Sequence, residues 1–291
     1  MSEANERPRA HPFFLPVEPG ARFCLVHEPV GDAAATQGLV FVHAFAEEMN
    51  KSRRMAAMQA RHFARHGLKV LQIDLYGCGD SNGDFSEARV EHWQRDITAA
   101  VEWLHAQAVE SVWLWGLRFG ALLAVHASRE LEAGMVTGLC LWQPVISGAT
   151  HLTQFLRIGV AAELLGSANG SGGSQAPRKQ LAAGSALEIA GYTITPQLAE
   201  AMDRLRLDDP PPQGVAVDWF EVGQGGVGAS LSVASQRVAG NWREQGVPVT
   251  CHAVSGVPFW ATVEITDCEE LLTRTTDVAA RQWLANSKRT R

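Results

Sequence analysis

The most informative segment of the chain is SVWLWGLRFGALLA, residues 111–124. Its apolar run at 112–115 ends at Gly116, and Gly120 follows four residues later. An Ala- and Leu-rich helical pattern then covers residues 121–127. An apolar run that ends at a glycine and leads into a helical pattern predicts a buried strand, a tight turn and the start of a helix.

The centre of this turn is Arg118. The spacing Gly-x-Ser-x-Gly is typical of a nucleophile elbow, in which a strained turn exposes a serine at the end of a strand. A guanidinium group stays protonated and has no lone pair to offer, so Arg118 cannot attack a carbonyl carbon. The segment therefore has the frame of a serine hydrolase without the nucleophile.

Strand and helix patterns continue on both sides of the elbow. Strands are expected at 13–17, 22–28, 38–45, 68–75, 135–144, 215–222 and 247–254, and helices at 53–66, 92–107, 231–245 and 275–286. The alternation from residue 38 to residue 145 predicts an α/β fold with a mostly parallel sheet and helices on both faces. Trp113 and Trp115, on the elbow strand, are expected in the core.

The alternation stops between residues 146 and 207. Helices are expected at 151–165 and 196–207, and the segment GSANGSGGS at 166–174 has the composition of a linker. We expect 146–207 to form a cap-like insertion over the site, because loops at the carboxyl ends of parallel strands carry function. Residues 1–145 and 208–291 would then form the core.

The composition fits a folded protein and excludes several function classes. With 291 residues, 46% hydrophobic and 19% charged, the chain can bury one large α/β domain, with or without an insertion. A net charge of −6 gives no reason to expect a nucleic-acid partner. The five cysteines lack the spacing of metal ligands, and no nucleotide fingerprint follows the first core strand, so no metal or other cofactor is expected.

The location of the protein is also constrained by composition. The first twenty residues lack the apolar centre of a signal peptide, and no stretch approaches the length of a membrane span. An odd number of scattered cysteines suits reduced thiols. We therefore expect a protein of a bacterial-type cytoplasm without a transmembrane segment.

Three motifs in order resemble the α/β-hydrolase superfamily. His43-Ala44-Phe45, at the end of a strand, is similar to the turn that supplies one oxyanion-hole donor. Residues 74–81 are similar to the family's Asp-x-x-Gly-x-Gly-x-Ser loop, and residues 116–120 take the place of the elbow. The resemblance covers nearly the whole chain in element order, and it implies the α/β-hydrolase fold.

A narrower resemblance rests on the arginine-centred elbow, HAFAEEMNKSRR at 43–54 and GVPFW at 256–260. These segments resemble the exosortase A system-associated hydrolase 2 group, whose members accompany bacterial exopolysaccharide and protein-sorting loci. The resemblance implies a genomic context and a possible partner protein from such a system, rather than a particular activity.

The chain departs from the hydrolase pattern at the rest of the triad as well. The resemblance implies a general-base histidine in the loop after the last strand, where residues 256–260 contain none. His252 lies earlier, inside the strand, and is expected to be structural. Glu221 is the nearest candidate for the triad acid, since no aspartate follows in its loop. A triad works as a unit, so Ser-His-Asp acyl transfer is not expected.

Two roles for Arg118 stay open. It could be a buried structural arginine held by a carboxylate. The candidate carboxylates are Glu47, Glu48 and Glu264. Alternatively, it could bind an anion at the positive end of the following helix, together with backbone donors of the oxyanion type. Those donors would be the N–H groups of Phe119 and of Ala44 or Phe45.

Three functional hypotheses follow. The chain could be a non-catalytic family member whose cavity binds an anionic ligand, such as a carboxylate, phosphate or acidic sugar. It could be an active enzyme in which Arg118 stabilises an oxyanion and Glu47 or Glu48 acts as acid/base. It could also be a scaffold or interaction protein that uses the insertion. In each case His43 would brace the oxyanion turn and Trp260 would line the cavity.

Overall fold

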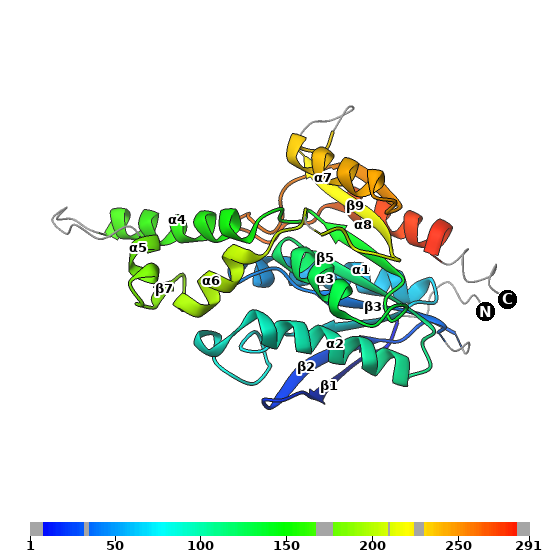
Figure 1. Cartoon of the computed structure of the whole chain (residues 1–291). Helices are drawn as coiled ribbons and strands as arrows, with labels where there is room; N and C mark the ends of the chain where they lie inside the picture. The colour runs from blue at the N-terminus through cyan, green and yellow to red at the C-terminus, as the bar shows by residue number, and fades with distance from the viewer. Residues whose placement is uncertain (1–7, 32–34, 167–176, 209, 224–229, 284–291) are drawn as a thin grey trace.

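An eight-stranded sheet lies at the centre of the protein, in the order β1-β2-β4-β3-β5-β6-β9-β10 (Figure 1). The computed structural model describes residues 8–31, 35–166, 177–208, 210–223 and 230–283. The strands are β1 (Ala10–Pro16), β2 (Ala21–His27), β3 (Gln37–Val42), β4 (Lys69–Ile73), β5 (Ser111–Leu117), β6 (Gly138–Trp142), β9 (Ala216–Gly223) and β10 (Val249–Ser255). Strand β2 pairs antiparallel with β1 and β4, and every other pairing in the sheet is parallel. The predicted mostly parallel sheet is confirmed.

Helices cover both faces of this sheet, as predicted. The core helices are α1 (Glu47–Arg65), α2 (Val90–Ala106), α3 (Phe119–Glu130), α7 (Val233–Glu244) and α8 (Glu269–Val278), with a π-helical turn at Ala279–Trp283. One apolar core contains side chains of α2, α3 and α7, and a second contains side chains of α1 and α8. Strand β5 alternates between them: Val112 and Leu114 enter the first core, while Trp113 and Trp115 enter the second.

Two helices begin six residues earlier than the sequence pattern predicted. Helix α1 begins at Glu47 rather than at residue 53, and α8 begins at Glu269 rather than at residue 275. In both, acidic side chains occupy the first turn, where they interact favourably with the positive end of the helix dipole. Strand β3 correspondingly ends at Val42 instead of continuing to residue 45. Glu47 and Glu48 are therefore held on a helix rather than in a loop.

The segment between β6 and β9 forms its own small group of elements. It contains α4 (Gly148–Gly166), α5 (Pro177–Ala182), β7 (Leu187–Ile189), β8 (Tyr192–Ile194) and α6 (Pro196–Arg204). In Figure 1 these elements extend to the left of the sheet. The β7–β8 hairpin was not expected from the sequence, whereas α6 begins at Pro196 as predicted. The predicted linker at 166–174 lies, beyond Gly166, outside the described residues.

The two ends of this segment lie side by side where it joins the sheet. Ser147 and Arg206 form an isolated antiparallel bridge, and the Gly148 N–H donates to the carbonyl oxygen of Leu205 at 3.0 Å. A Cβ atom at Gly148 would approach the Met202 carbonyl oxygen to 2.0 Å, so only glycine allows this contact. The division into a core and an insertion stays a prediction. Among the described residues, no helix is both long and apolar enough to cross a membrane.

Candidate functional site

Arg118 lies at the tip of the turn between β5 and α3. Its backbone has φ 56° and ψ −118°, a left-handed region that non-glycine residues rarely adopt. Two glycines make the turn possible. A Cβ atom at Gly116 would lie 2.4 Å from the Cα of Ala121, and one at Gly120 would lie 2.3 Å from the carbonyl oxygen of His43. The strained turn between strand and helix thus follows from the spacing of the glycines, as the sequence predicted.

The side chain of Arg118 is held on two sides. Its Nε and Nη2 atoms both donate to Oε1 of Glu48, at 3.2 and 3.1 Å. The guanidinium carbon also lies 5.4 Å from the ring centroid of Trp260, within the range of a cation–π interaction. In the described part of the chain, Nη1 of Arg118 makes no hydrogen bond. The side chain is 18% exposed, so Arg118 keeps one open donor group.

Of the three carboxylates considered as partners, Glu48 is the one that pairs with Arg118. It lies in the first turn of α1, and its side chain is 15% exposed. Burial raises the pKa of Glu48, while the neighbouring Arg118 acts in the opposite direction. Atom Oε2 of Glu48 and Oε2 of Glu47 are both buried without a hydrogen-bond partner among the described residues. No contact joins Glu264 to Arg118 in the same residues.

The backbone donors predicted for an oxyanion-type site include those of Phe119 and Phe45. Phe119 is the first residue of α3, and Phe45 lies in the turn after β3. Within the described ranges, neither backbone N–H has a hydrogen-bond acceptor. The two rings pack edge to face with centroids 5.5 Å apart. The side chain of Ala44, between the strand and Phe45, is fully buried in the second core.

His43 braces this turn, as predicted. Its Nδ1 lies 2.8 Å from the carbonyl oxygen of Ala44, and its Nε2 lies 3.1 Å from the backbone nitrogen of Leu75. Since the Leu75 N–H can only donate, Nε2 is the acceptor and Nδ1 carries the proton. Burial lowers the pKa of His43, which keeps the ring in this neutral form. His43 therefore has a structural role that uses both ring nitrogens.

Hydrogen bonds of the Asp74 carboxylate hold the glycine-rich loop after β4 in place. Asp74 accepts hydrogen bonds from Arg53 and from the backbone N–H of Asp80, both at 3.1 Å. Arg53 and its neighbour Arg54 both lie within α1 with exposed side chains, and Arg54 pairs with Asp267 at 2.8 Å. Burial raises the pKa of the Cys78 thiol. Cys78 is therefore a protonated core residue and a poor nucleophile.

Glu221 and His252, the other residues considered for the triad, make their hydrogen bonds away from Arg118. The carboxylate of Glu221 accepts hydrogen bonds from the backbone N–H of Ser232 at 2.7 Å and from the hydroxyl of Ser235 at 3.0 Å, so it caps the start of α7. His252 is buried against Asp218, with Nε2 and Oδ1 2.9 Å apart. Trp260, in the loop after β10, occupies the side of Arg118 where the family resemblance implied a histidine.

One buried residue at the site was not singled out from the sequence. His151, near the start of α4, is 5% exposed, and both of its ring nitrogens are buried without a hydrogen-bond partner among the described residues. Its ring stacks on Phe119, with centroids 5.5 Å apart and planes at 14°, and meets the edge of Phe45 at 5.8 Å. Burial, with a smaller effect of the Arg118 charge, lowers the pKa of His151 to about 3. The available signal was a lone polar residue beside Leu152 and Phe155 on an apolar helix face.

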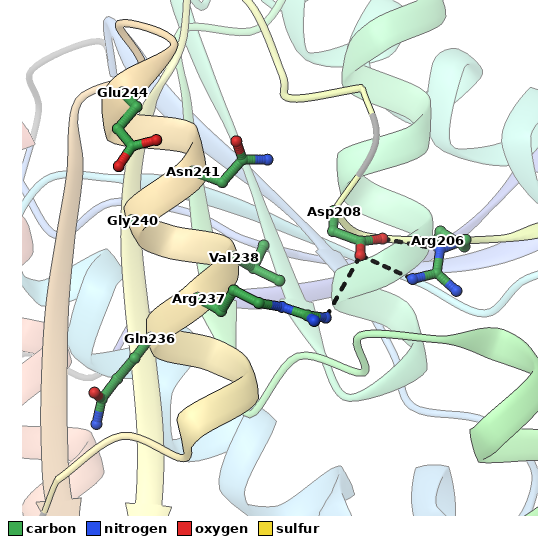
Figure 2. Close-up of a pocket in the computed structure, with 8 residues that line it drawn as sticks. All are labelled: Arg206, Asp208, Gln236, Arg237, Val238, Gly240, Asn241 and Glu244. Carbon is green, nitrogen blue, oxygen red and sulfur yellow. Dashed lines mark hydrogen bonds and ion pairs between the residues drawn. The ribbon is translucent and has the colours of Figure 1, made fainter.

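The structure contains a small cavity lined in part by Phe45 and Phe119 and a larger cleft lined by other residues. The one enclosed by the Phe45 and Phe119 rings measures about 10 Å³, close to the smallest space that holds a water molecule. A larger cleft of about 730 Å³ lies between α7 and the segment after α6 (Figure 2). There Asp208 pairs with Arg206 at 2.8 Å and lies 3.9 Å from Arg237. This polar cleft shares no lining residue with the Arg118 site.

No group of three His, Cys, Asp or Glu side chains in the described residues could hold a metal ion. The chemistry available at the elbow is therefore that of a guanidinium, a carboxyl group, a neutral imidazole and backbone N–H donors. Such a set can bind an anion and, through Glu48, exchange a proton.

Comparisons with known proteins agree with this fold. The family model described as serine aminopeptidase, S33, matches residues 33–182, just over half of the chain. Among solved structures, the chain is similar to Est1E from Butyrivibrio proteoclasticus with bound ferulic acid, at a TM-score of 0.67 and 17% identity, covering 94% of this chain and 98% of that one. No curated protein sequence matches the chain.

Two further structures extend the likeness. The esterase PF2001 from Pyrococcus furiosus has a TM-score of 0.60 at 12% identity, covering 94% of this chain and 91% of that chain. XC6422 from Xanthomonas campestris, an α/β serine hydrolase without a lid, has a TM-score of 0.53 at 16% identity. The match covers 94% of this chain and 95% of that chain. At these identities the likeness establishes the fold.

Proposed function

Because the chain belongs to the serine aminopeptidase (S33) family of α/β-hydrolases and carries Arg118 at the tip of its elbow, we propose that it binds an anionic small molecule there without Ser-His-Asp hydrolysis. The observation that carries the proposal is the incomplete pairing of Arg118. One carboxylate oxygen of Glu48 takes two of its donors, and Nη1 stays free in the described part of the chain.

The surroundings of Arg118 support an anion rather than a neutral ligand. The N-terminus of α3 presents its positive dipole end and unpaired N–H groups at this point. The free N–H groups of Phe119 and Phe45 add donors of the kind that bind an oxyanion. A planar guanidinium fork matches carboxylate and phosphate groups. The ligand class is therefore a carboxylate, a phosphate or an acidic sugar.

Glu48 controls how strongly such an anion binds. Its carboxylate competes with the ligand for Arg118 and repels a second negative charge. Burial favours the neutral form of Glu48, so ligand binding would be accompanied by uptake of a proton. This coupling distinguishes a ligand site from a closed structural ion pair, in which no exchange takes place.

Calorimetric titration with inorganic phosphate and D-glucuronate tests the proposal. Arg118→Gln should abolish binding, whereas Arg54→Gln, which removes an exposed arginine of α1, should leave it unchanged. Ferulic acid, bound by Est1E, is a useful third probe because it joins a carboxylate to an aromatic ring. A wild-type protein that binds none of these anions would show that the Arg118–Glu48 pair is structural.

Hydrolysis is tested separately with p-nitrophenyl esters. We expect no activity above background for the wild type or for Arg118→Ser, because restoring the serine does not restore its base. Ester hydrolysis by the wild type that disappears in Arg118→Ala would contradict a non-hydrolytic role.

One observation favours an alternative function, an enzyme with non-standard chemistry. Glu48 combines a pKa raised by burial with a position opposite Arg118, and a raised pKa suits an acid/base carboxyl at neutral pH. Arg118 would stabilise an oxyanion while Glu48 moves a proton; Glu47, whose Oε2 is also buried and unpaired, is the second carboxyl. Turnover of an anionic ester that is lost in Glu48→Gln but kept in Glu47→Gln would favour this enzyme.

The pathway assignment rests on the resemblance to the exosortase A system-associated hydrolase 2 group. On this basis we propose a cytoplasmic role beside exopolysaccharide or protein-sorting components. A scaffold role through the insertion has less support. Ile158 is the one exposed large hydrophobic side chain among the residues of 146–207 whose side chains are described, so no apolar docking patch is present there. Deletion of the gene, with exopolysaccharide output and complementation by Arg118→Gln as readouts, tests the pathway assignment.

A further inference from the structure

His151 is the histidine of the described residues in which both ring nitrogens are buried and unbonded. Burying polar atoms without partners costs free energy, so such atoms usually mark a place where water or a ligand completes the hydrogen bonds. The ring is held by its stacking on Phe119 and by the edge of Phe45. Phe119 begins α3 directly after Arg118 and Phe45 lies in the turn after β3, and the charge of Arg118 is near enough to act on the His151 ring.

The part of the protein that the structure describes offers no hydrogen-bond partner for this ring. The neighbouring buried side chains of α4 are Leu152 and Phe155, and Phe155 also packs edge to face on Phe45 at 5.2 Å. Carbon atoms of these groups can neither donate nor accept a hydrogen bond. A neutral imidazole needs one acceptor and one donor, so a bare anion would satisfy only half of it.

We propose that His151 binds a hydroxyl group of the same ligand whose anionic group is bound by Arg118. This inference rests on the proposed function and narrows its ligand class to hydroxylated acids, such as sugar acids. A hydroxyl group both donates and accepts, so it suits either nitrogen of a neutral ring. The imidazole would form a hydrogen bond with the hydroxyl group, while the guanidinium and the backbone N–H groups bind the negatively charged group.

Access to His151 requires α4 to move away from α3. His151 lies in the first turn of α4, three residues after Gly148, and next to the Ser147–Arg206 bridge where the segment joins the sheet. The proposal requires a rotation of α4 at that joint, which would separate the His151 and Phe119 rings. A ligand held by both residues would then link α4 to the elbow.

Two matched acids test the proposal on the full-length protein. D-Glucuronate and cyclohexanecarboxylate share a six-membered ring and one carboxylate, but only glucuronate carries hydroxyl groups. By calorimetry, the wild type should bind glucuronate about tenfold or more tightly than cyclohexanecarboxylate. His151→Phe keeps the stacking on Phe119 and should remove this preference while leaving cyclohexanecarboxylate binding unchanged. His151→Gln, which keeps a donor and an acceptor, should retain part of it.

The possible failures separate the two proposals. Equal binding of both acids by the wild type, or an unchanged preference in His151→Phe, would overturn the role of His151 while leaving the anion site intact. If Arg118→Gln still bound both acids, or if the wild type bound neither, the proposed function itself would be overturned. A melting curve confirms that each variant is folded; an effect on melting alone, without a change in preference, would assign His151 a packing role only.

Discussion

Arg118 donates two hydrogen bonds to a single oxygen of Glu48, at 3.2 and 3.1 Å, while the second oxygen of that carboxylate is buried without a partner. An ion pair of this kind is incomplete on both sides. Partial pairing of buried charges is costly, because each unpaired atom has lost its water. This incomplete pairing is the reason for proposing that a ligand replaces Glu48 at Arg118.

Removal of the Glu48 charge should strengthen anion binding. Glu48→Gln keeps the shape of the side chain but leaves the positive charge of Arg118 uncompensated. We expect the affinity for glucuronate to rise about tenfold, equivalent to about 1.4 kcal/mol, as measured by calorimetry. Glu47→Gln, which alters the adjacent carboxyl without a bond to Arg118, should change the affinity far less. A weaker affinity in Glu48→Gln would mean that Glu48 contacts the ligand favourably.

The affinity for an anion should depend on pH in a defined direction. Burial raises the pKa of Glu48 above its ordinary value of 4.5, so its charge is lost as the pH falls through this raised pKa. The ligand carboxylate stays ionised over that interval, because an ordinary carboxyl titrates near pH 3.5. Affinity should therefore rise as the pH falls from neutral toward the ordinary glutamate value of 4.5. Glu48→Gln should flatten the profile, and a flat wild-type profile would contradict the proton coupling.

Acid should destabilise the fold through His151. Its pKa falls from an ordinary 6.5 to about 3, so the unfolded chain takes up a proton that the folded chain does not. The free energy of unfolding therefore does not depend on His151 above about pH 6.5. As the pH falls from about 6.5 toward 3, it decreases by up to about 1.4 kcal/mol per pH unit. Urea unfolding at several pH values should show a smaller loss for His151→Phe. His11→Phe, at an exposed position on β1, should keep the wild-type dependence.

The elbow should not tolerate a side chain at Gly120. A Cβ atom there would lie 2.3 Å from the carbonyl oxygens of Val42 and His43, which are backbone atoms that cannot move aside. We expect Gly120→Ala to lower the free energy of unfolding by about 1–3 kcal/mol. Gly240→Ala in α7 has open space around it and should raise that free energy by about 0.5–1 kcal/mol. Chemical denaturation measures both; similar effects at the two glycines would contradict the steric account.

Much of the frame of the site could be predicted from local patterns. The glycines at 116 and 120, the buried strand before them and the helix after them all act over a few residues. The bracing role of His43 likewise follows from its place at the end of a strand. Such features can be predicted because steric limits and hydrophobic periods operate within one turn of chain.

The starts of α1 and α8 could not be predicted in the same way. The first turn of α1 is acidic and polar, and its sequence EEMNKS has the composition of a loop. Its helical state is supported by Met49 and Ser52, which are buried against the rest of the fold. Tertiary packing here decides the structure of residues whose own preference is weak.

The aromatic surroundings of His151 could not be predicted from the sequence either. A histidine on an apolar helix face is usually a core residue with satisfied hydrogen bonds, so its position beside Leu152 and Phe155 is only a weak signal. Only the packing of α4 on the elbow reveals that its neighbours are aromatic rings without polar atoms.

The sequence by itself determined the sheet, the elbow and the absence of a serine at its tip, because each of these depends on residue types at short spacing. Tertiary structure alone decided that Arg118 meets Glu48, 70 positions away, that Trp260 covers its other side, and that Glu221 caps α7 instead of facing it. The physical reason is that periodicity reports which face of an element is buried. It does not report which distant side chain the folded chain brings against that face.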